Sequence, residues 1–342
     1  MLALLLTGAL LGGCVFSAPR YRGPVSDHFD GEAFHNPPGV PDHGFSEVLR
    51  WQRERQPGEW RDFAEAPPGP APVPWVGDGR MRVTFVNHAT VLVQMDGLNI
   101  LTDPIWSDRC SPVPFAGPHR VRPPGIRFED LPAIDVILIS HNHYDHLDLP
   151  TLRRLVHAFP QVKIFAGLGV GLLLTREGLH GSVELDWWQE RPLAEGVKVI
   201  AVPVQHFSGR GLTDRNATLW TGFSVKGPSG SLYLAGDTGY GPHFQAVRER
   251  LGSPRLALLP IGAYLPQWFM SPVHINPEEA LRAHTDLGAG TSVAIHFGTF
   301  PLADDGQDQP VRELERALAG NAELRSRFWV LGFGEGREVP PL

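Results

Sequence analysis

The chain has 342 residues, of which 42% are hydrophobic and 20% are charged, and this ordinary balance excludes disorder along its whole length. The length is sufficient for one large domain or two average ones. The formal net charge is -7 and no block of consecutive Lys or Arg is present, which argues against a nucleic-acid partner and against polybasic attraction to an anionic membrane.

The chain begins with an apolar run, residues 2–15, which is too short to span a bilayer but fits the apolar core of a signal peptide. The run contains LGGC at residues 11–14, which resembles the lipobox of bacterial lipoproteins. The resemblance implies a signal peptide over residues 1–13, an acylated Cys14 and a lipid anchor in the bacterial cell envelope. The residue after the cysteine is Val15 rather than Asp. This resembles bacterial lipoproteins of the outer membrane, so we expect the protein to be anchored there and to face the periplasm.

The same segment has an alternative interpretation, a chance apolar start that leaves an unmodified thiol. No Lys or Arg precedes the run, so the true start codon stays open. If Cys14 is a thioether, Cys110 has no partner within the chain, and we expect no internal disulfide.

A proline-rich segment follows, with eleven of the 33 prolines between residues 15 and 79. Proline at this density disfavours helix and sheet, so residues 14–79 are predicted to form an arm that lies on a domain or tethers it. One short helix is expected within the arm, over residues 45–60. The globular domain is predicted to cover residues 80–342.

The domain shows short apolar strands that alternate with helical patterns. Residues 90–95 and 98–102 form a predicted β-hairpin around Asp96 and Gly97, a favoured two-residue connection. Residues 135–140 form a continuous apolar strand, and a helix follows with Asp148 as N-cap and Pro150 in its first turn. Further strands are expected at 163–166, 197–204, 219–225, 232–235, 256–261 and 292–295, and helices at 244–251, 277–287 and 311–318. This mixture predicts layered sheets with helices outside.

Four metal-ligand residues lie within six positions directly after the strand at 135–140: His141, His143, Asp145 and His146. Buried imidazoles and carboxylates are costly unless they are paired or bound to metal. His141 and His143 are two apart, so they project the same way from an extended segment. Asp145 and His146 lie further round the bend and can face a second ion. The alternative, a solvated His-rich loop, does not explain so many ligands in one place.

Three more ligand-type residues, His206, Asp237 and His296, each follow a predicted strand. Each alone is typical of an ordinary loop residue, but their shared sheet edge makes them candidate ligands. Nitrogen and oxygen ligands without thiolate suit zinc, and iron and manganese are compatible with the same types.

The pattern HxHxDH, followed by a distant His, a Gly-Asp and a final His, resembles the metallo-β-lactamase superfamily. The resemblance implies an α/β fold, the αβ/βα sandwich, in which two mixed β-sheets are flanked by helices. It also implies two divalent metal ions, with zinc favoured. One ion is assigned to His141, His143 and His206, and the other to Asp145, His146 and His296, with Asp237 bridging.

Longer strings resemble the N-acylphosphatidylethanolamine-hydrolysing phospholipase D family, at residues 101–105, 139–148, 184–188, 235–240, 260–264, 268–270 and 293–300. The resemblance runs from about residue 34 to near the C-terminus. It implies a zinc-dependent phosphodiesterase that releases N-acylethanolamine and phosphatidate through a metal-bridging hydroxide. No Ser or Cys nucleophile is needed, and the chain has no G-x-S-x-G motif.

The family pattern assigns catalytic roles to Asp145, Asp237 and His274. It places Tyr144 and His274 beside the substrate phosphate, although a helix-entry role for His274 stays open. Trp268, with Phe269 and Met270, is predicted to bind the acyl chains of the phospholipid. Trp187 and Trp188 are interpreted either as a second apolar approach or as core residues.

Asp103 is predicted either to accept a ring N–H from a ligating histidine or to be a turn residue. His88 is interpreted as a support of the ligands or a structural residue. The other histidines considered, His119, His157, His180, His243 and His284, have no ligand spacing and are expected at the surface or in packing.

Two rival functions stay open. One is a lactonase or a phosphodiesterase of the same fold that acts on a soluble substrate, and a β-lactamase has no support beyond the shared ligands. The other is a non-catalytic envelope lipoprotein that retains metal for stability. The expected partners are a phospholipid substrate and, through Cys14, a membrane, and a homodimer is compatible with the sequence.

Overall fold

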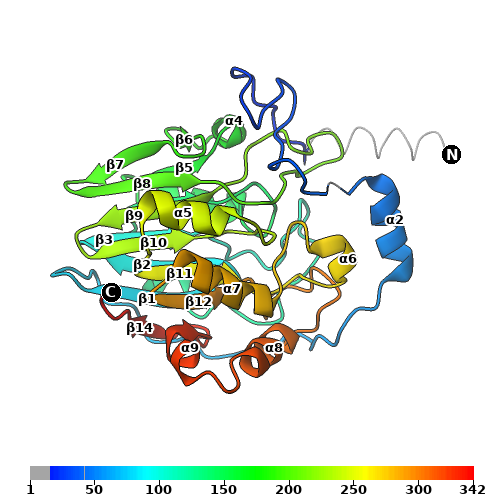
Figure 1. Cartoon of the computed structure of the whole chain (residues 1–342). Helices are drawn as coiled ribbons and strands as arrows, with labels where there is room; N and C mark the ends of the chain where they lie inside the picture. Colours follow the sequence, from blue (N-terminus) through cyan, green and yellow to red (C-terminus); the bar gives the residue numbers. More distant parts are fainter. Residues whose placement is uncertain (1–15, 42) are drawn as a thin grey trace.

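Two seven-stranded mixed β-sheets form the centre of the molecule in a computed structural model that describes residues 16–41 and 43–342 (Figure 1). The first sheet has the order β14-β1-β2-β3-β4-β5-β6, and the second has the order β13-β12-β11-β10-β9-β8-β7. The predicted sandwich of two mixed β-sheets is confirmed.

The strands of the first sheet are β1 (Met81–Asn87), β2 (Thr90–Met95), β3 (Leu98–Thr102), β4 (Val136–Ile139), β5 (Lys163–Gly167), β6 (Val183–Leu185) and β14 (Gly336–Glu338). Those of the second are β7 (Glu190–Ala194), β8 (Val197–Val202), β9 (Gly222–Gly227), β10 (Gly230–Leu234), β11 (Leu256–Pro260), β12 (Thr291–Ile295) and β13 (Phe328–Trp329). Strands β3 to β6 are parallel, as are β10 to β13.

Helices cover the outer face of each sheet. Leu152 and Leu173 of α3 (Leu149–Ala158) and α4 (Val170–Arg176) pack on the first sheet. In front of the second sheet in Figure 1 lie α5 (His243–Leu251) and α7 (Pro277–Leu287), and their buried side chains belong to the same core cluster as residues of that sheet. The remaining helices are α2 (Phe45–Glu54), α6 (Gln267–Met270), α8 (Gln309–Ala317), α9 (Ala322–Arg327) and a 3-10 turn at Phe128–Asp130.

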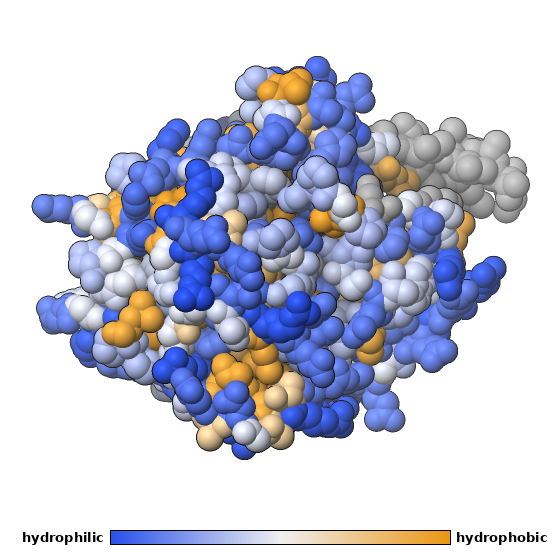
Figure 2. Space-filling model, viewed as in Figure 1, coloured by the Kyte–Doolittle hydropathy of each residue, from blue (hydrophilic) through white to orange (hydrophobic). Residues whose placement is uncertain are grey.

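Apolar side chains are concentrated inside these layers. One core cluster contains Val83 and Val93 from the first sheet together with Val199, Leu232 and Val293 from the second, so the two sheets share one interior. The face seen in Figure 2 is mostly hydrophilic, with small hydrophobic patches between the charged residues. No helix in the described part of the chain is long and apolar enough to cross a bilayer.

The predicted hairpin is confirmed, because β2 and β3 pair with Met95 opposite Leu98. The turn residues Asp96 and Gly97 have φ values of 51° and 77°, as a type I′ connection requires. The predicted helix over residues 45–60 is wrong beyond Glu54. After Arg55 the chain is extended, and Gly58 packs so closely that a Cβ atom there would lie 2.4 Å from the backbone nitrogen of Gly306.

The proline-rich arm lies along the domain over its described length. Its aromatic residues Tyr21, Phe29 and Phe34 pack in one cluster with Trp187 and Trp220. The predicted signal peptide, residues 1–13, and Cys14 lie outside the described residues.

His28 links the arm to the domain through two carboxylates. Its Nδ1 lies 2.6 Å from Asp27 Oδ1, its Nε2 lies 2.7 Å from Asp186 Oδ1, and its ring stacks on Trp187. Burial lowers the pKa of His28, but the hydrogen bonds and charges of Asp186 and Asp27 outweigh it, and the net result is a raised pKa. The imidazolium form therefore stabilises the docked arm.

The His28→Gln variant is expected to be less stable than the wild type in acid and to lose this difference as the pH rises. A raised pKa in the folded state means that the contribution is complete below the ordinary value of 6.5 and disappears as the pH rises through the folded-state pKa. Melting temperatures of both proteins, measured from about pH 5 to about pH 9, test this. A difference that grows with pH would contradict it.

Candidate metal centre

The seven predicted ligands come together at one edge of the two sheets. His141 to His146 follow β4, which runs parallel to β3 and β5. His206, Asp237 and His296 follow β8, β10 and β12, which point the same way in the second sheet. Strand ends that share one edge bring residues from distant parts of the chain to one place.

A first group consists of three histidines. His141 Nε2 lies 2.8 Å from His143 Nδ1, and His206 Nε2 lies 3.2 Å from the same atom. Each ring therefore directs one nitrogen toward a common point.

A second group surrounds Asp145. Its Oδ2 atom lies 2.8 Å from His88 Nε2, 3.2 Å from His146 Nε2 and 3.3 Å from His296 Nε2. His88, which spacing alone leaves as a supporting residue, thus contacts the carboxylate directly.

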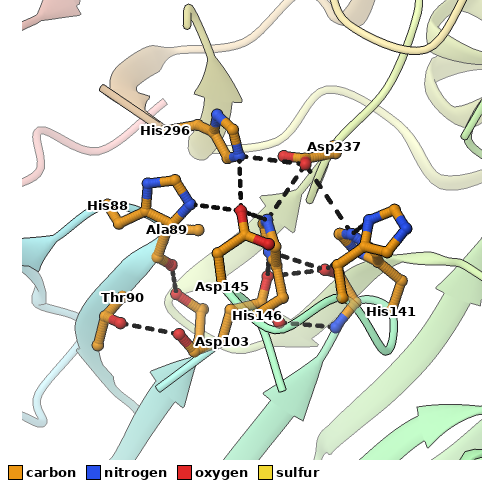
Figure 3. Close-up of polar contacts among 12 residues, drawn as sticks. His88, Ala89, Thr90, Asp103, His141, Asp145, His146, Asp237 and His296 are labelled. Atoms are coloured by element: carbon orange, nitrogen blue, oxygen red, sulfur yellow. Dashed lines mark hydrogen bonds and ion pairs between the residues drawn. The ribbon is translucent and has the colours of Figure 1, made fainter. Parts of the chain in front are cut away.

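Asp237 lies between the two groups, as Figure 3 shows. Its Oδ2 atom is 3.1 Å from Nε2 of both His146 and His296, in the second group. The same atom is 3.9 Å from His141 Nε2 and 3.8 Å from His206 Nε2, in the first. One carboxylate therefore faces both sets of imidazoles.

The hydrogen bonding of His146 tests whether a cation fits. Its Nδ1 lies 2.8 Å from Asp103 Oδ2, which confirms that Asp103 accepts from a histidine of the cluster. Nδ1 then carries the proton, and the lone pair of Nε2 points at Asp145 and Asp237, 3.2 Å and 3.1 Å away, without a hydrogen bond. This contact is repulsive unless a proton on Nε2 or a metal cation between the atoms compensates the negative charge.

The spacing of these atoms also suits a metal ion. Ligands about 2.0–2.1 Å from one zinc ion in a tetrahedron lie about 3.3 Å apart. The contacts around His146 and His296, at 3.1 to 3.3 Å, agree with this value. The donor set therefore fits divalent metal.

The pKa shifts differ between the two groups. Burial raises the pKa of Asp145 and Asp237, but the adjacent histidines, His146 first among them, hold both well below the usual range. Burial lowers the pKa of His143 to about 4. Burial also lowers the pKa of His146 and His296, but Asp237 and Asp145 outweigh it, so the pKa of His146 is raised and that of His296 rises to about 9. The carboxylates therefore attract positive charge to these two rings, and a bound divalent metal would take the place of their protons.

Comparison with known proteins identifies the family. Residues 98–297 match the beta-lactamase superfamily domain. The chain belongs to the metallo-β-lactamase superfamily. It is 43% identical over 257 residues to an N-acyl-phosphatidylethanolamine-hydrolyzing phospholipase D of Caenorhabditis elegans, a match that covers 72% of each protein.

A further relative agrees with a metal-dependent hydrolase, and a solved structure agrees with the fold. A metal-dependent hydrolase of Methanopyrus kandleri is 30% identical over 245 residues, which cover 69% of this chain and 92% of the relative. The structure of a metallo hydrolase from Ignicoccus hospitalis matches the fold with a TM-score of 0.55 and 24% identity, over 76% of this chain and 98% of that one. The chain is thus a metal-dependent hydrolase of the metallo-β-lactamase superfamily, and the predicted resemblance is confirmed.

A pocket of about 320 Å³ opens onto the metal centre. Residues from both groups form its floor, together with His274. Its wall is largely apolar and comes partly from α6 and partly from the arm. The apolar lining residues include Val48, Trp51, Phe207, Phe269, Met270, Val273 and Leu302.

His274 lies where the sequence predicts a substrate contact. It lines the pocket, and its ring centre is 5.2 Å from that of His206 and 5.5 Å from that of His296. Tyr144 instead lines a neighbouring cavity, where the Arg210 guanidinium lies 3.8 Å above its ring. Tyr144 is therefore not among the residues that line the pocket with His274.

The aromatic residues that the sequence offers for acyl-chain binding lie in different surroundings. Trp268 is 38% exposed and lies outside the pocket lining, beneath the Arg50 guanidinium, whereas its neighbour Phe269 lines the pocket. Of the three residues predicted to bind acyl chains, Phe269 and Met270 line the pocket and Trp268 does not. Trp187 and Trp188 pack against core clusters, which supports their interpretation as core residues.

One contact to a predicted ligand is not apparent from spacing. Asn36, in the arm, donates from Nδ2 to the backbone oxygen of His206 at 2.7 Å and accepts from its backbone N–H at 3.0 Å. The arm therefore holds the backbone of His206 as well as lining the pocket.

Proposed function

We propose that this hydrolase cleaves the phosphodiester of N-acylphosphatidylethanolamine at two divalent metal ions, releasing N-acylethanolamine and phosphatidate. The observation that carries the proposal is the pocket itself, whose floor is the metal centre and whose wall is apolar. A phospholipid presents a phosphodiester beside acyl chains, so it uses both surfaces at once. The similarity to the Caenorhabditis elegans enzyme supports the same substrate.

In this proposal, different residues of the chain hold the ions and orient the ligands. The ligand residues would hold two divalent ions, favoured to be zinc, and such ions when bound would supply polarisation of a phosphodiester oxygen and a lowered pKa, towards about 7, for a water molecule. Asp237 would hold the two sites at a fixed separation, since its Oδ2 faces both groups. Asp145 keeps its orientation through the N–H of His88 at 2.8 Å. The proposed ligands are His141, His143 and His206 for one ion and Asp145, His146 and His296 for the other.

His274, which lines the pocket, would contact the reacting phosphate from outside the proposed ligand set. Desolvation lowers the pKa of His274 to about 4, with Asp237 opposing and His296 adding to the shift. The ring is therefore neutral at pH 7 and offers one N–H donor. We propose that this N–H donates a hydrogen bond to an oxygen of the reacting phosphate and so stabilises negative charge there as the leaving oxygen departs.

Hydrolysis assays on purified protein of known metal content test the proposal. N-acylphosphatidylethanolamine, a lactone and a soluble phosphodiester should be compared under one condition. Cleavage of the lipid with release of N-acylethanolamine is expected to exceed the other two reactions. A preference for the lactone or for the soluble diester would replace the phospholipid with that rival substrate, and activity on none would favour the non-catalytic alternative.

Phe269→Ala is expected to weaken turnover of a long-chain lipid while sparing a short, soluble phosphodiester, because only the lipid needs the apolar wall. Truncating a phenylalanine removes about 2 kcal/mol of apolar contact, or about thirtyfold in kcat/KM. Trp268→Ala is the matched control, since this neighbouring ring lies outside the pocket and should change either rate little. Equal losses on both substrates for Phe269→Ala would mean that its ring only supports the fold.

We also propose that Cys14 is acylated and anchors the protein to the outer membrane, facing the periplasm. The proposal rests on LGGC at residues 11–14, on Val15, and on the net charge of -7, which offers no basic attachment to lipid. Cys14→Ser is expected to release active protein from the membrane fraction of the producing cell. Persistent membrane association of that variant would show that another surface or a partner holds the protein.

A further inference from the structure

His296 has one ring nitrogen whose partner remains to be identified. Its Nε2 faces the carboxylates of Asp145 and Asp237, whereas its Nδ1 is buried without a hydrogen-bond partner. Figure 3 shows this second nitrogen pointing away from the two carboxylates. If Nε2 offers its lone pair to a metal ion, Nδ1 must carry the proton, and a buried N–H needs an acceptor.

Other histidines of the centre meet this need directly. His146 Nδ1 lies 2.8 Å from Asp103 Oδ2, and His206 Nδ1 lies 3.0 Å from the backbone oxygen of Val273. Such outer contacts fix the tautomer and the orientation of a ligating ring. His296 therefore differs from His146 and His206, because its Nδ1 has no hydrogen-bond partner.

A small cavity lies beside His296. It has a volume of about 10 Å³, and its lining includes His296, Asp305, His88 and Gln307 together with apolar side chains such as Phe300. A volume of this size accommodates about one water molecule. The cavity is thus too small for an organic ligand but large enough for one water molecule that bridges two polar groups.

Asp305 supplies the missing acceptor. It is 4% exposed, and its Oδ2 accepts the backbone N–H of Ala263 at 3.0 Å. Its Oδ1 is buried without a partner. Two residues that line the same cavity therefore each carry a buried polar atom without a partner, a donor on His296 and an acceptor on Asp305.

We infer that one buried water molecule joins His296 Nδ1–H to Asp305 Oδ1. Asp305 is then a positioning residue that holds the His296 ring, through the water, in the tautomer that offers Nε2 to metal. The inference rests on the metal site of the proposed function but not on the identity of the substrate.

Metal affinity of two Asp305 variants separates this role from a structural one. Asp305→Asn keeps the shape and the acceptor for Ala263 but turns an N–H₂ group toward the water, whereas Asp305→Ala removes both contacts. The inference predicts about 10- to 100-fold weaker zinc binding at one site in both variants, measured by competition with a chelator. Asp308→Asn is the matched control, because this nearby carboxylate pairs with Arg61 at the surface, and its affinity should be unchanged.

A role limited to holding the Ala263 loop predicts normal affinity for Asp305→Asn and a loss only for Asp305→Ala. That result would overturn the inference, as would normal affinity in both variants. A high-resolution crystal structure of the zinc-loaded wild type should show a water within hydrogen-bond distance of both atoms, and a dry cavity would also overturn it. A wild type that binds no metal would overturn the proposed function itself, which keeps the two failures distinct.

Discussion

Asp237→Ala is expected to abolish measurable turnover and to reduce the metal content below the two ions per chain proposed for the wild type. The Asp237 carboxylate is 2% exposed and faces four imidazole nitrogens, two in each group. Removing one member of a buried charged set costs about 3–5 kcal/mol, because the remaining charges are left without compensation. A loss of that size corresponds to at least about two powers of ten in rate.

Asp237→Asn distinguishes charge from shape. The amide keeps the volume of the side chain but not its charge, so most of the loss should remain. Metal analysis by mass spectrometry, together with lipid hydrolysis, measures both effects, and Asp308→Asn serves again as the surface control. Full activity or two bound ions in Asp237→Ala would refute the shared-carboxylate arrangement.

His274→Phe is expected to reduce turnover by about 10- to 100-fold while both ions stay bound. One hydrogen bond to a charged phosphate contributes about 1.5–3 kcal/mol, and the phenyl ring keeps the packing but cannot donate. His274 lies outside the proposed ligand set, with its ring centre 5.2 Å from that of His206. Its loss should therefore leave the metal content unchanged.

His274→Gln provides the comparison, because its amide restores an N–H donor without an ionisable ring. We expect this variant to retain more activity than His274→Phe. Equal losses in the two variants would mean that the imidazole acts by some means other than donating a hydrogen bond. A loss of metal in either variant would make His274 a ligand instead.

The metal centre could be predicted from the sequence because its ligands are indicated by residue type and by local spacing. His141 and His143 follow an apolar strand at an interval of two, and no packing role explains that pattern. The same spacing does not predict in which direction the side chains next to the ligands point. Tyr144 lies between two inward-facing residues, and its ring turns to the adjacent cavity. Around Trp268 the chain forms the short helix α6, in which Phe269 lines the pocket and Trp268 does not.

The central elements of both sheets are predictable for a related reason. Strands β2, β3 and β11 are apolar runs bounded by turn residues, and their predicted and observed limits agree closely. The edge strands β6, β13 and β14 have three, two and three residues, and such short segments carry no periodic pattern. Their pairing depends on neighbours that are distant in the sequence.

The arm has a consequence for the order in which the protein is made. Asn36 holds the backbone of His206, and Arg55 binds Asp304 at 2.9 Å, so early residues depend on partners that emerge much later from the ribosome. The arm is synthesised before either partner exists, so these contacts can form only after the later residue of each pair has emerged. The wall that the arm contributes to the pocket therefore cannot be complete until residue 304, near the C-terminal end of the chain, has been synthesised.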